Sequence, residues 1–182
     1  MENNEDGSIP KLSQLLTTQE IKKSNNINKI TDKIYLGDDE GAKEFDYLRA
    51  EQIHYVLSFV ANPPVYPEDM KINLMHINLE ETLSINIITY TKQCISFIDN
   101  ADKIFIHCTC GINRSPAIVI GYLMWKTHSN YDDVFNYVKQ KRECIQPINP
   151  FIIQLKKFHT LLTKNNYNLD QVIVNTRTKS LK

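Results

Sequence analysis

The stretch HCTCGINRSP, residues 107–116, decides the fold of this chain. It follows the apolar run Ile104–Ile106 and precedes the apolar run Ala117–Ile120, an order that predicts a strand, a tight loop and a helix. The loop begins at Cys108 and contains Arg114 six positions later. A loop that opens a helix directs several backbone N–H groups at one point, where the helix dipole adds partial positive charge. The sequence therefore predicts a site for a phosphate-sized anion at the start of this helix.

The residue types in this loop suit a reactive thiol beside a bound anion. The helix N-terminus and the nearby guanidinium of Arg114 favour the thiolate form of Cys108, which is the nucleophilic form. Arg114 can bind two phosphate oxygens with its planar fork, which a lysine cannot do. Gly111 allows the positive φ that a tight loop needs, and Pro116 suits the first turn of a helix. Ser115 is placed to cap that helix, and its hydroxyl can hydrogen-bond the sulfur of Cys108.

Length and composition indicate one domain of ordinary size. The chain has 182 residues, and its hydrophobic content of 42% supports a core. The formal net charge of zero argues against nucleic acid or an anionic membrane as a partner. No apolar stretch approaches the roughly 20 residues of a membrane-spanning helix, and the polar, acidic start MENNEDGSIP is not a signal peptide. The four cysteines show neither metal-ligand spacing nor a disulfide framework, which indicates a reducing compartment, the cytosol or nucleus. No Asp/His cluster is present to bind a metal, and we expect no cofactor.

Hydrophobic periodicity divides the chain into three parts. We expect a flexible polar N-terminal arm over 1–28, a folded domain over 29–164 and a polar C-terminal tail over 165–182. Within the domain, the expected strands are 30–36 (as a pair broken at 31–32), 55–60, 72–79 and 103–108, and the expected helices are 38–50, 86–99, 116–126, 132–141 and 149–162. Strands that alternate with helices imply a single α/β domain with a central, mostly parallel sheet flanked by helices. The helix over 116–126 is apolar nearly all round, so we expect it to be buried.

The string HCTCGINRSP resembles the H-C-x5-R-[ST] signature of the cysteine-dependent protein phosphatases, and more narrowly of their small dual-specificity branch. The stretches KIYLGDDEGAKEFDYLRAEQIHYVLSFV (33–60), ISFIDNADKIFIHC (95–108) and RECIQPINPFIIQLKKF (142–158) are similar to other segments of that domain. The resemblance implies a phosphatase-like fold and a phosphoric monoester hydrolase that needs no metal. It implies phosphoprotein substrates, with hydrolysis of phosphotyrosine and of phosphoserine or phosphothreonine through a cysteinyl-phosphate. The oligomeric state stays open.

The resemblance also implies roles for individual residues. Cys108 is the nucleophile, Arg114 binds the transferred phosphoryl group, and Ser115 stabilises the departing thiolate. The phosphate oxygens are held by backbone N–H groups of the loop, which comprises Thr109, Cys110, Gly111, Ile112, Asn113 and Arg114. His107 orients the loop rather than acting as a base, and Asn149 braces it, although the order Ile148-Asn149-Pro150 departs from the commoner Pro-Asn order of the family.

The general acid departs from the family pattern. The family places an aspartate on the loop after the strand that ends near Leu79, where this chain has Glu80 and Glu81. Counting along the chain puts Glu81 at the position of the acid, and proton donation to a leaving group contributes typically 10²–10⁴-fold. Alternatively, both glutamates are solvated loop charges. Asp69 and Asp99 are further candidates.

Two other features of the loop leave alternatives open. Cys110 is either a small residue that lines the loop or a redox partner of Cys108. The loop positions between Cys108 and Arg114 carry no charge, which favours a singly phosphorylated group over a phosphoinositide. If the acid is compromised, the chain is a phosphatase-like module that binds phosphoproteins and turns them over poorly. An RNA 5′-phosphatase shares the loop, but the neutral net charge speaks against it.

Overall fold

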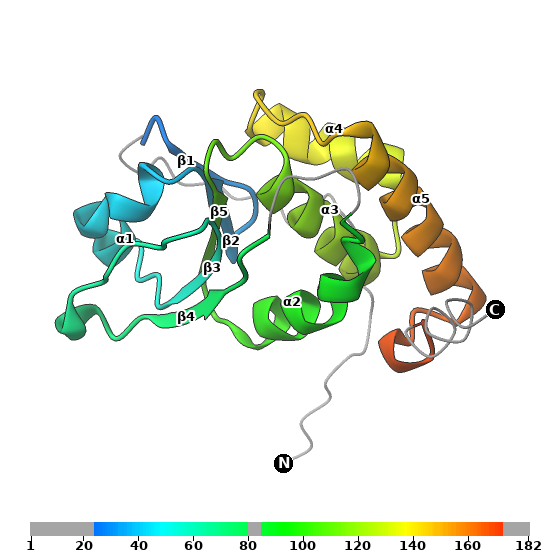
Figure 1. Ribbon diagram of the computed structural model, residues 1–182, viewed down its shortest axis with the longest axis horizontal. Helices are drawn as coiled ribbons and strands as arrows, with labels where there is room; N and C mark the ends of the chain where they lie inside the picture. The colour runs from blue at the N-terminus through cyan, green and yellow to red at the C-terminus, as the bar shows by residue number, and fades with distance from the viewer. Residues whose placement is uncertain (1–23, 80–84, 173–182) are drawn as a thin grey trace, which may run out of the picture.

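A mixed sheet places Cys108 at its centre. In this computed structural model, which describes residues 24–79 and 85–172, the sheet has five strands in the order β1-β2-β5-β3-β4. Their bounds are β1 Ile27–Lys29, β2 Ile34–Gly37, β3 Tyr55–Phe59, β4 Asn73–His76 and β5 Ile104–Cys108. β5 pairs in parallel with β2 on one side and β3 on the other, and only the β1–β2 pairing within this sheet is antiparallel. The predicted α/β fold with a central, mostly parallel sheet is confirmed (Figure 1).

The folded part begins earlier than predicted. β1 starts at Ile27, inside the segment expected to be an arm over 1–28, and forms a hairpin with β2. The reason is a polar anchor before the strand, in which Ser24 Oγ and Asn26 Nδ2 both donate to Glu44 Oε1, over 2.9 and 2.8 Å. Residues 1–23 lie outside the described part of the chain.

The helices lie on both faces of the sheet. Short helices η2 (Gly41–Lys43), α1 (Phe45–Ala50) and η3 (Glu68–Met70) belong to one side, and α2 (Ile88–Asn100), α3 (Arg114–Thr127), α4 (Tyr131–Lys141) and α5 (Asn149–Lys164) cover the other. The single helix expected over 38–50 is wrong, because Glu44 has ψ 62° and interrupts the helical backbone. Among the described residues, no helix is long and apolar enough to cross a bilayer.

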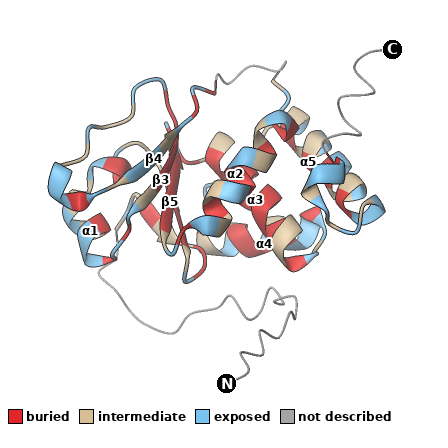
Figure 2. Cartoon of the chain, turned by 90° about the horizontal axis from the view of Figure 1, so that it is seen from below, coloured by how far each residue is buried: buried red, intermediate tan, exposed pale blue. Residues whose placement is uncertain are grey.

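The two faces of the sheet bury different sets of side chains. Alternate residues of β5 point to opposite faces, so Ile104 and Ile106 join the core under α3 while Phe105 joins the core under α1. α3 is buried along most of its length, as predicted for 116–126, with only Trp125 and Lys126 partly exposed in that range (Figure 2).

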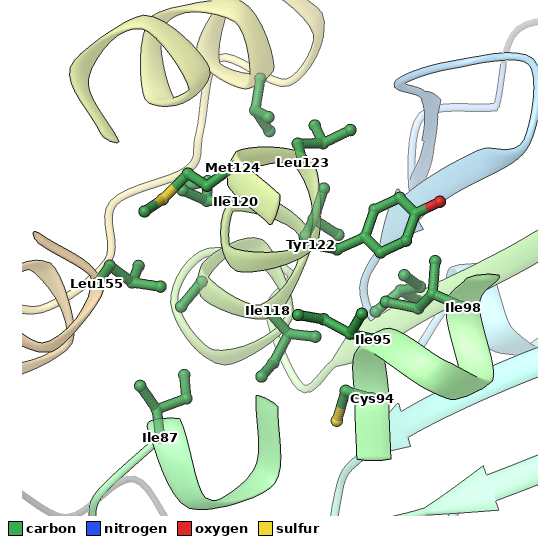
Figure 3. Packing of buried hydrophobic residues seen from close by; sticks show 14 of the residues in the cluster. Ile87, Cys94, Ile95, Ile98, Ile118, Ile120, Tyr122, Leu123, Met124 and Leu155 are labelled. Carbon is green, nitrogen blue, oxygen red and sulfur yellow. The ribbon is translucent and has the colours of Figure 1, made fainter. Parts of the chain in front are cut away.

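Figure 3 shows how α3 fills the larger core. Its side chains Ile118 and Ile120 lie near Ile95 of α2 and Leu155 of α5. Other buried residues of α2 and α5 belong to the same core. A helix that is apolar nearly all round needs such neighbours on every side, and α2, α4, α5 and the sheet supply them.

The C-terminal tail also begins later than predicted. Residues 165–172 pack on the domain instead of leaving it at 165: Val172 is fully buried, and the backbone carbonyl of Tyr167 accepts a 3.0 Å hydrogen bond from Trp125 Nε1. The ring of Tyr167 also stacks on His128, with centroids 3.6 Å apart. The physical reason is that the exposed end of α3 offers aromatic surface to this segment. Residues 173–182 lie outside the described part.

Candidate active site

Cys108 is the last residue of β5 and is only 2% exposed. α3 begins at Arg114, so its N-terminus faces the loop that Cys108 opens. Ser115 Oγ donates a hydrogen bond to Cys108 Sγ over 3.2 Å, as the sequence indicates. Ser115 does not cap the helix, however. The cap position is Asn113, because the helix starts one residue before Ser115 and places it in the first turn.

The phosphate loop requires glycine at position 111. Gly111 has φ +62°, and a Cβ atom there would lie 2.5 Å from the carbonyl oxygen of Gly37. That distance is far inside van der Waals contact, so the loop and the end of β2 approach more closely than any side chain permits. Asp39 N–H donates to Thr109 O over 3.2 Å next to this contact. The loop is thus held against the end of β2.

Arg142 braces the back of the loop, a role that the sequence did not reveal. Its side chain is 5% exposed, and its Nε donates to Gly111 O over 3.0 Å while Nη2 lies 3.4 Å from Cys110 O. Nη1 donates to Asn28 Oδ1 over 2.7 Å, and Nη2 pairs with Asp38. A guanidinium that binds loop carbonyls fixes the peptide planes and leaves the opposite N–H groups available to an anion. Only its position as the arginine that follows α4 could have drawn attention to it.

Asn149 does not take the bracing role expected of it. It is exposed at the first residue of α5, as the unusual order Ile-Asn-Pro would lead one to expect. The segment before it holds the loop instead: Gln146 N–H donates to Ile112 O over 2.7 Å, and Ile148 N–H donates to Asn113 Oδ1 over 2.9 Å. Loop and segment therefore form one hydrogen-bonded unit.

The guanidinium of Arg114 is held across the mouth of the loop. Its Nη1 donates to Phe59 O and Leu79 O, both over 3.0 Å, and its Nη2 donates to Thr109 Oγ1 over 2.9 Å. These partners come from the end of β3, from the segment after β4 and from the loop itself. The arginine is thus positioned by hydrogen bonds to three separate segments of the chain.

A pocket of about 180 Å³ lies at this point. It is lined by Cys108, Cys110, Ile112, Asn113, Arg114, Gln146 and Ile148. Four of the six predicted phosphate-binding residues therefore line it, while Thr109 and Gly111 lie in the loop away from its wall. Arg114 is the one charged residue in this lining, so the pocket suits one phosphoryl group.

His107 lies on the opposite side of the sheet from the thiol. It is fully buried and stacks on Phe105 with ring centroids 5.4 Å apart. Burial lowers the pKa of His107 to about 4, against a smaller opposing effect of the carboxylates of Asp39 and Asp38. The imidazole is therefore neutral at pH 7, which fits the expected positioning role better than proton transfer.

The candidates for the general acid are distributed over the molecule. Glu80 and Glu81 lie outside the described residues. Asp69 pairs with Arg49 at 2.9 Å on the surface near η3, and Asp99 accepts from Tyr122 and Lys126 at the end of α2. Both aspartates are therefore engaged in structural contacts.

The cysteines and possible metal ligands complete the description of the site. Cys110 is exposed at the pocket and, like Cys94, Cys108 and Cys144, is a free thiol. Within the described part of the chain, no group of three or more metal-ligating side chains comes together.

Known proteins share this architecture. The family described as "Dual specificity phosphatase, catalytic domain" matches residues 34–160. A relative named "Probable rhodanese domain-containing dual specificity protein phosphatase", from Dictyostelium discoideum, is 35% identical over 139 residues, which cover 74% of this chain and 29% of that protein. The chain likewise spans 65% of a second Dictyostelium relative, a probable dual specificity protein phosphatase that is 32% identical. The chain thus spans less than two thirds of the first curated relatives it matches.

Solved structures agree in fold. The crystal structure of DUSP15 superposes with a TM-score of 0.70 at 29% identity, covering 75% of this chain and 88% of that one. The structure of the human tyrosine phosphatase-like serine/threonine/tyrosine-interacting protein superposes with a TM-score of 0.72 at 25% identity, covering 77% and 99%. Together with the family match over most of the domain, these likenesses show that the chain belongs to the dual specificity phosphatase catalytic-domain family.

Proposed function

We propose that this chain is a metal-independent protein phosphatase that hydrolyses phosphotyrosine and phosphoserine or phosphothreonine through a cysteinyl-phosphate. The observation that carries the proposal is the position of Cys108 between the end of β5 and the N-terminus of α3, beside a pocket of about 180 Å³ that also contains Arg114. Thiol, anion-binding backbone and a planar cation thus meet at one point, which is what in-line attack on a phosphate monoester requires.

In the first step, the thiolate of Cys108 attacks phosphorus, a P–S bond forms and the P–O bond to the substrate breaks. The departing oxygen takes a proton, and we assign Glu81 as the residue that donates it. Loop N–H groups and Arg114 bind the equatorial oxygens as charge spreads over them. The hydrogen bonds to the loop carbonyls support this role, because Arg142 binds Gly111 O and the backbone N–H of Gln146 binds Ile112 O, which fixes the loop peptides.

In the second step, water attacks phosphorus and the P–S bond breaks. The electron pair of that bond returns to Cys108, where the hydroxyl of Ser115 donates to the sulfur and makes it a better leaving group. The carboxylate of Glu81 accepts the proton from the attacking water, which restores the acid for the next cycle.

The pocket lining supports singly phosphorylated protein side chains as substrates. Ile112 and Ile148 present apolar groups, and Gln146 and Cys110 are uncharged, so a second phosphate on the ligand would meet no cation in this lining other than Arg114. Free thiols at all four cysteines fit a reducing compartment, which supports phosphoproteins of the cytosol or nucleus.

The second candidate function is a binding module that holds phosphoproteins and hydrolyses them poorly. The replacement of the family's aspartate by glutamate at position 81 favours it, and one structural neighbour is named a phosphatase-like interacting protein. The presence of Cys108, Arg114 and the Ser115 hydrogen bond favours the enzyme.

Steady-state hydrolysis by the purified full chain distinguishes the two. The substrates are an aryl phosphate and three peptides that differ only in carrying phosphoserine, phosphothreonine or phosphotyrosine. Cys108→Ser should lose more than ~10³-fold in turnover while still binding vanadate, and Cys144→Ser, which changes an exposed thiol away from the pocket, should behave like wild type. Saturable binding of the phosphopeptides to the wild type without turnover would favour the module instead.

A further inference from the structure

A row of polar side chains crosses the sheet directly behind the phosphate loop. In the register of the parallel strands, His107 of β5 lies between Gly37 of β2 and Ser58 of β3, and Ser58 lies beside His76 of β4. Residues in register point to the same face of a sheet, which here is the face covered by α1. Two residues earlier along the strands, the row of side chains on the same face is apolar and includes Phe105 of β5. The polar row is therefore a local departure within a hydrophobic layer.

Several atoms in this region are buried without a hydrogen-bond partner among the described residues. They are Asp39 Oδ1, Ser58 Oγ, Tyr66 Oη and both ring nitrogens of His107. Buried polar atoms in folded proteins are almost always hydrogen-bonded, and leaving one unsatisfied costs about 1–3 kcal/mol. A cluster of such atoms from four segments therefore points to a shared network rather than to separate defects.

Asp39 is the member that joins the cluster to the loop. It follows β2 by two residues, and its backbone N–H donates to Thr109 O. Its Oδ2 lies 3.3 Å from Lys43 Nζ, so Oδ1 is the oxygen that remains for the interior. Its carboxylate opposes the lowering of the His107 pKa and adds to the raised pKa of Tyr66. Tyr66 packs on Phe45 of α1 with centroids 5.7 Å apart, which fixes the ring over this region.

We propose that Asp39, Ser58 and Tyr66 are positioning residues that hold the imidazole of His107 in one tautomer through a hydrogen-bonded network, closed by a buried water, behind the phosphate loop. Donors and acceptors suit this arrangement. A neutral imidazole has one donor nitrogen and one acceptor nitrogen, and the hydroxyls of Ser58 and Tyr66 can each donate and accept. The carboxylate oxygen of Asp39 can only accept, so the hydrogen bonds of the network are donated toward Asp39. A site lined by several polar atoms is the kind that retains a buried water.

The network acts on the reaction through the backbone, and this step rests on the proposed function. His107 and Cys108 are consecutive, so the orientation of the imidazole sets the peptide plane that leads into the nucleophile. The charged or titratable groups around this cluster have partners of their own, and the backbone of Cys108 also interacts with the imidazole. Asp38 pairs with Arg142, Lys43 lies beside Asp39, and His76 Nε2 is 2.6 Å from Val60 O.

The test uses Ser58→Ala and Tyr66→Phe, each of which removes one hydroxyl, with Tyr47→Phe as the matched control. Tyr47 packs on the same hydrophobic cluster as Tyr66, but its hydroxyl is not one of the buried atoms without a hydrogen-bond partner. The first measurement is the ¹⁵N spectrum of the His107 ring at pH 7. The second is the pH dependence of Cys108 alkylation by iodoacetate, followed by mass spectrometry of the peptide that contains Cys108. Melting temperatures establish that each variant is folded.

We expect a single His107 tautomer in the wild type and in Tyr47→Phe, and a mixture in Ser58→Ala and Tyr66→Phe. The midpoint of Cys108 alkylation should move by about 0.5 pH unit or more in these two variants, and kcat/KM for an aryl phosphate should fall about tenfold. Unchanged tautomer and midpoint in both variants would overturn the proposal. The spectrum and the alkylation need no turnover, so a wild type that proves inactive would refute the proposed function and leave this test decisive.

Discussion

The hydroxyl of Ser115 lies 3.2 Å from the sulfur of Cys108, and both side chains are buried. The two residues are seven positions apart, yet the loop between them folds back so that the first turn of α3 faces the end of β5. A hydroxyl that donates to sulfur stabilises negative charge there, which matters most when the sulfur leaves phosphorus in the second step.

Ser115→Ala should therefore slow the breakdown of the cysteinyl-phosphate more than its formation. We expect kcat to fall by about 10–100-fold while kcat/KM changes much less, since kcat/KM reports the first step. Pre-steady-state hydrolysis of an aryl phosphate should then show a burst that the wild type lacks. Ser115→Thr keeps the hydroxyl and should restore kcat. Equal losses in kcat and kcat/KM for the alanine variant would mean that the hydroxyl assists the attack instead.

Arg142 should contribute more to the free energy of unfolding than an exposed ion pair of an arginine with a carboxylate does. Arg142→Ala leaves Asp38 and the carbonyls of Gly111 and Cys110 without their partner in a buried place, so we expect a loss of about 3–5 kcal/mol in the free energy of unfolding. Arg49→Ala is the control, because its pairs with Asp69 and Asp46 are exposed and should be worth less than ~1 kcal/mol.

Urea denaturation of both arginine variants at pH 7 measures this difference. Arg142→Ala should also bind vanadate more weakly, because the loop carbonyls are then free to turn toward the pocket. A loss of stability no larger than that of Arg49→Ala would show that other contacts hold the loop.

His107 should make stability depend on pH below neutrality. Its pKa is about 4 in the folded protein and 6.5 ordinarily, so between these values the unfolded chain binds a proton that the folded protein does not. The contribution of His107 to the free energy of unfolding is complete above pH 6.5 and is lost as the pH falls toward 4, with a total of about 3 kcal/mol.

The comparison variant for this effect is His107→Asn, which cannot titrate. Between pH 7 and pH 5, the wild type should lose about 2 kcal/mol more than the variant in the free energy of unfolding. Chemical denaturation at a series of pH values measures this. Parallel pH profiles of the two proteins would mean that the pKa of the imidazole is the same in the folded and the unfolded protein.

Glu81→Gln should slow the hydrolysis of phosphoserine much more than that of an activated aryl phosphate. An alkoxide leaves poorly without a proton, whereas a good aryl leaving group needs little help, so we expect a loss of about 100-fold for the phosphoserine peptide. Glu80→Gln should do less, because counting along the chain puts Glu81, and not Glu80, at the position of the acid. The ratio of the two substrates' kcat/KM values is the measurement. Equal effects of the two substitutions would place the acid elsewhere and strengthen the binding-module alternative.

Local pattern was enough to predict the architecture. The strand, loop and helix around residues 107–116 follow from two apolar runs and the turn-forming residues between them, and the burial of α3 follows from a helix that has no polar face. The hydrogen bond from Ser115 to Cys108 was predictable for the same reason, since it joins the two ends of one tight loop.

Only the tertiary structure decided which distant residues hold the loop. Arg142 reaches the loop carbonyls from the end of α4, and Asp39 reaches Thr109 from the end of β2, although neither lies near the loop in sequence. The exposed Asn149 and the split of the helix expected over 38–50 are likewise consequences of packing. Periodicity encodes which face of an element is buried, because burial depends on side chains along that element. Which polar partner meets that face depends on how elements far apart in sequence cross in space.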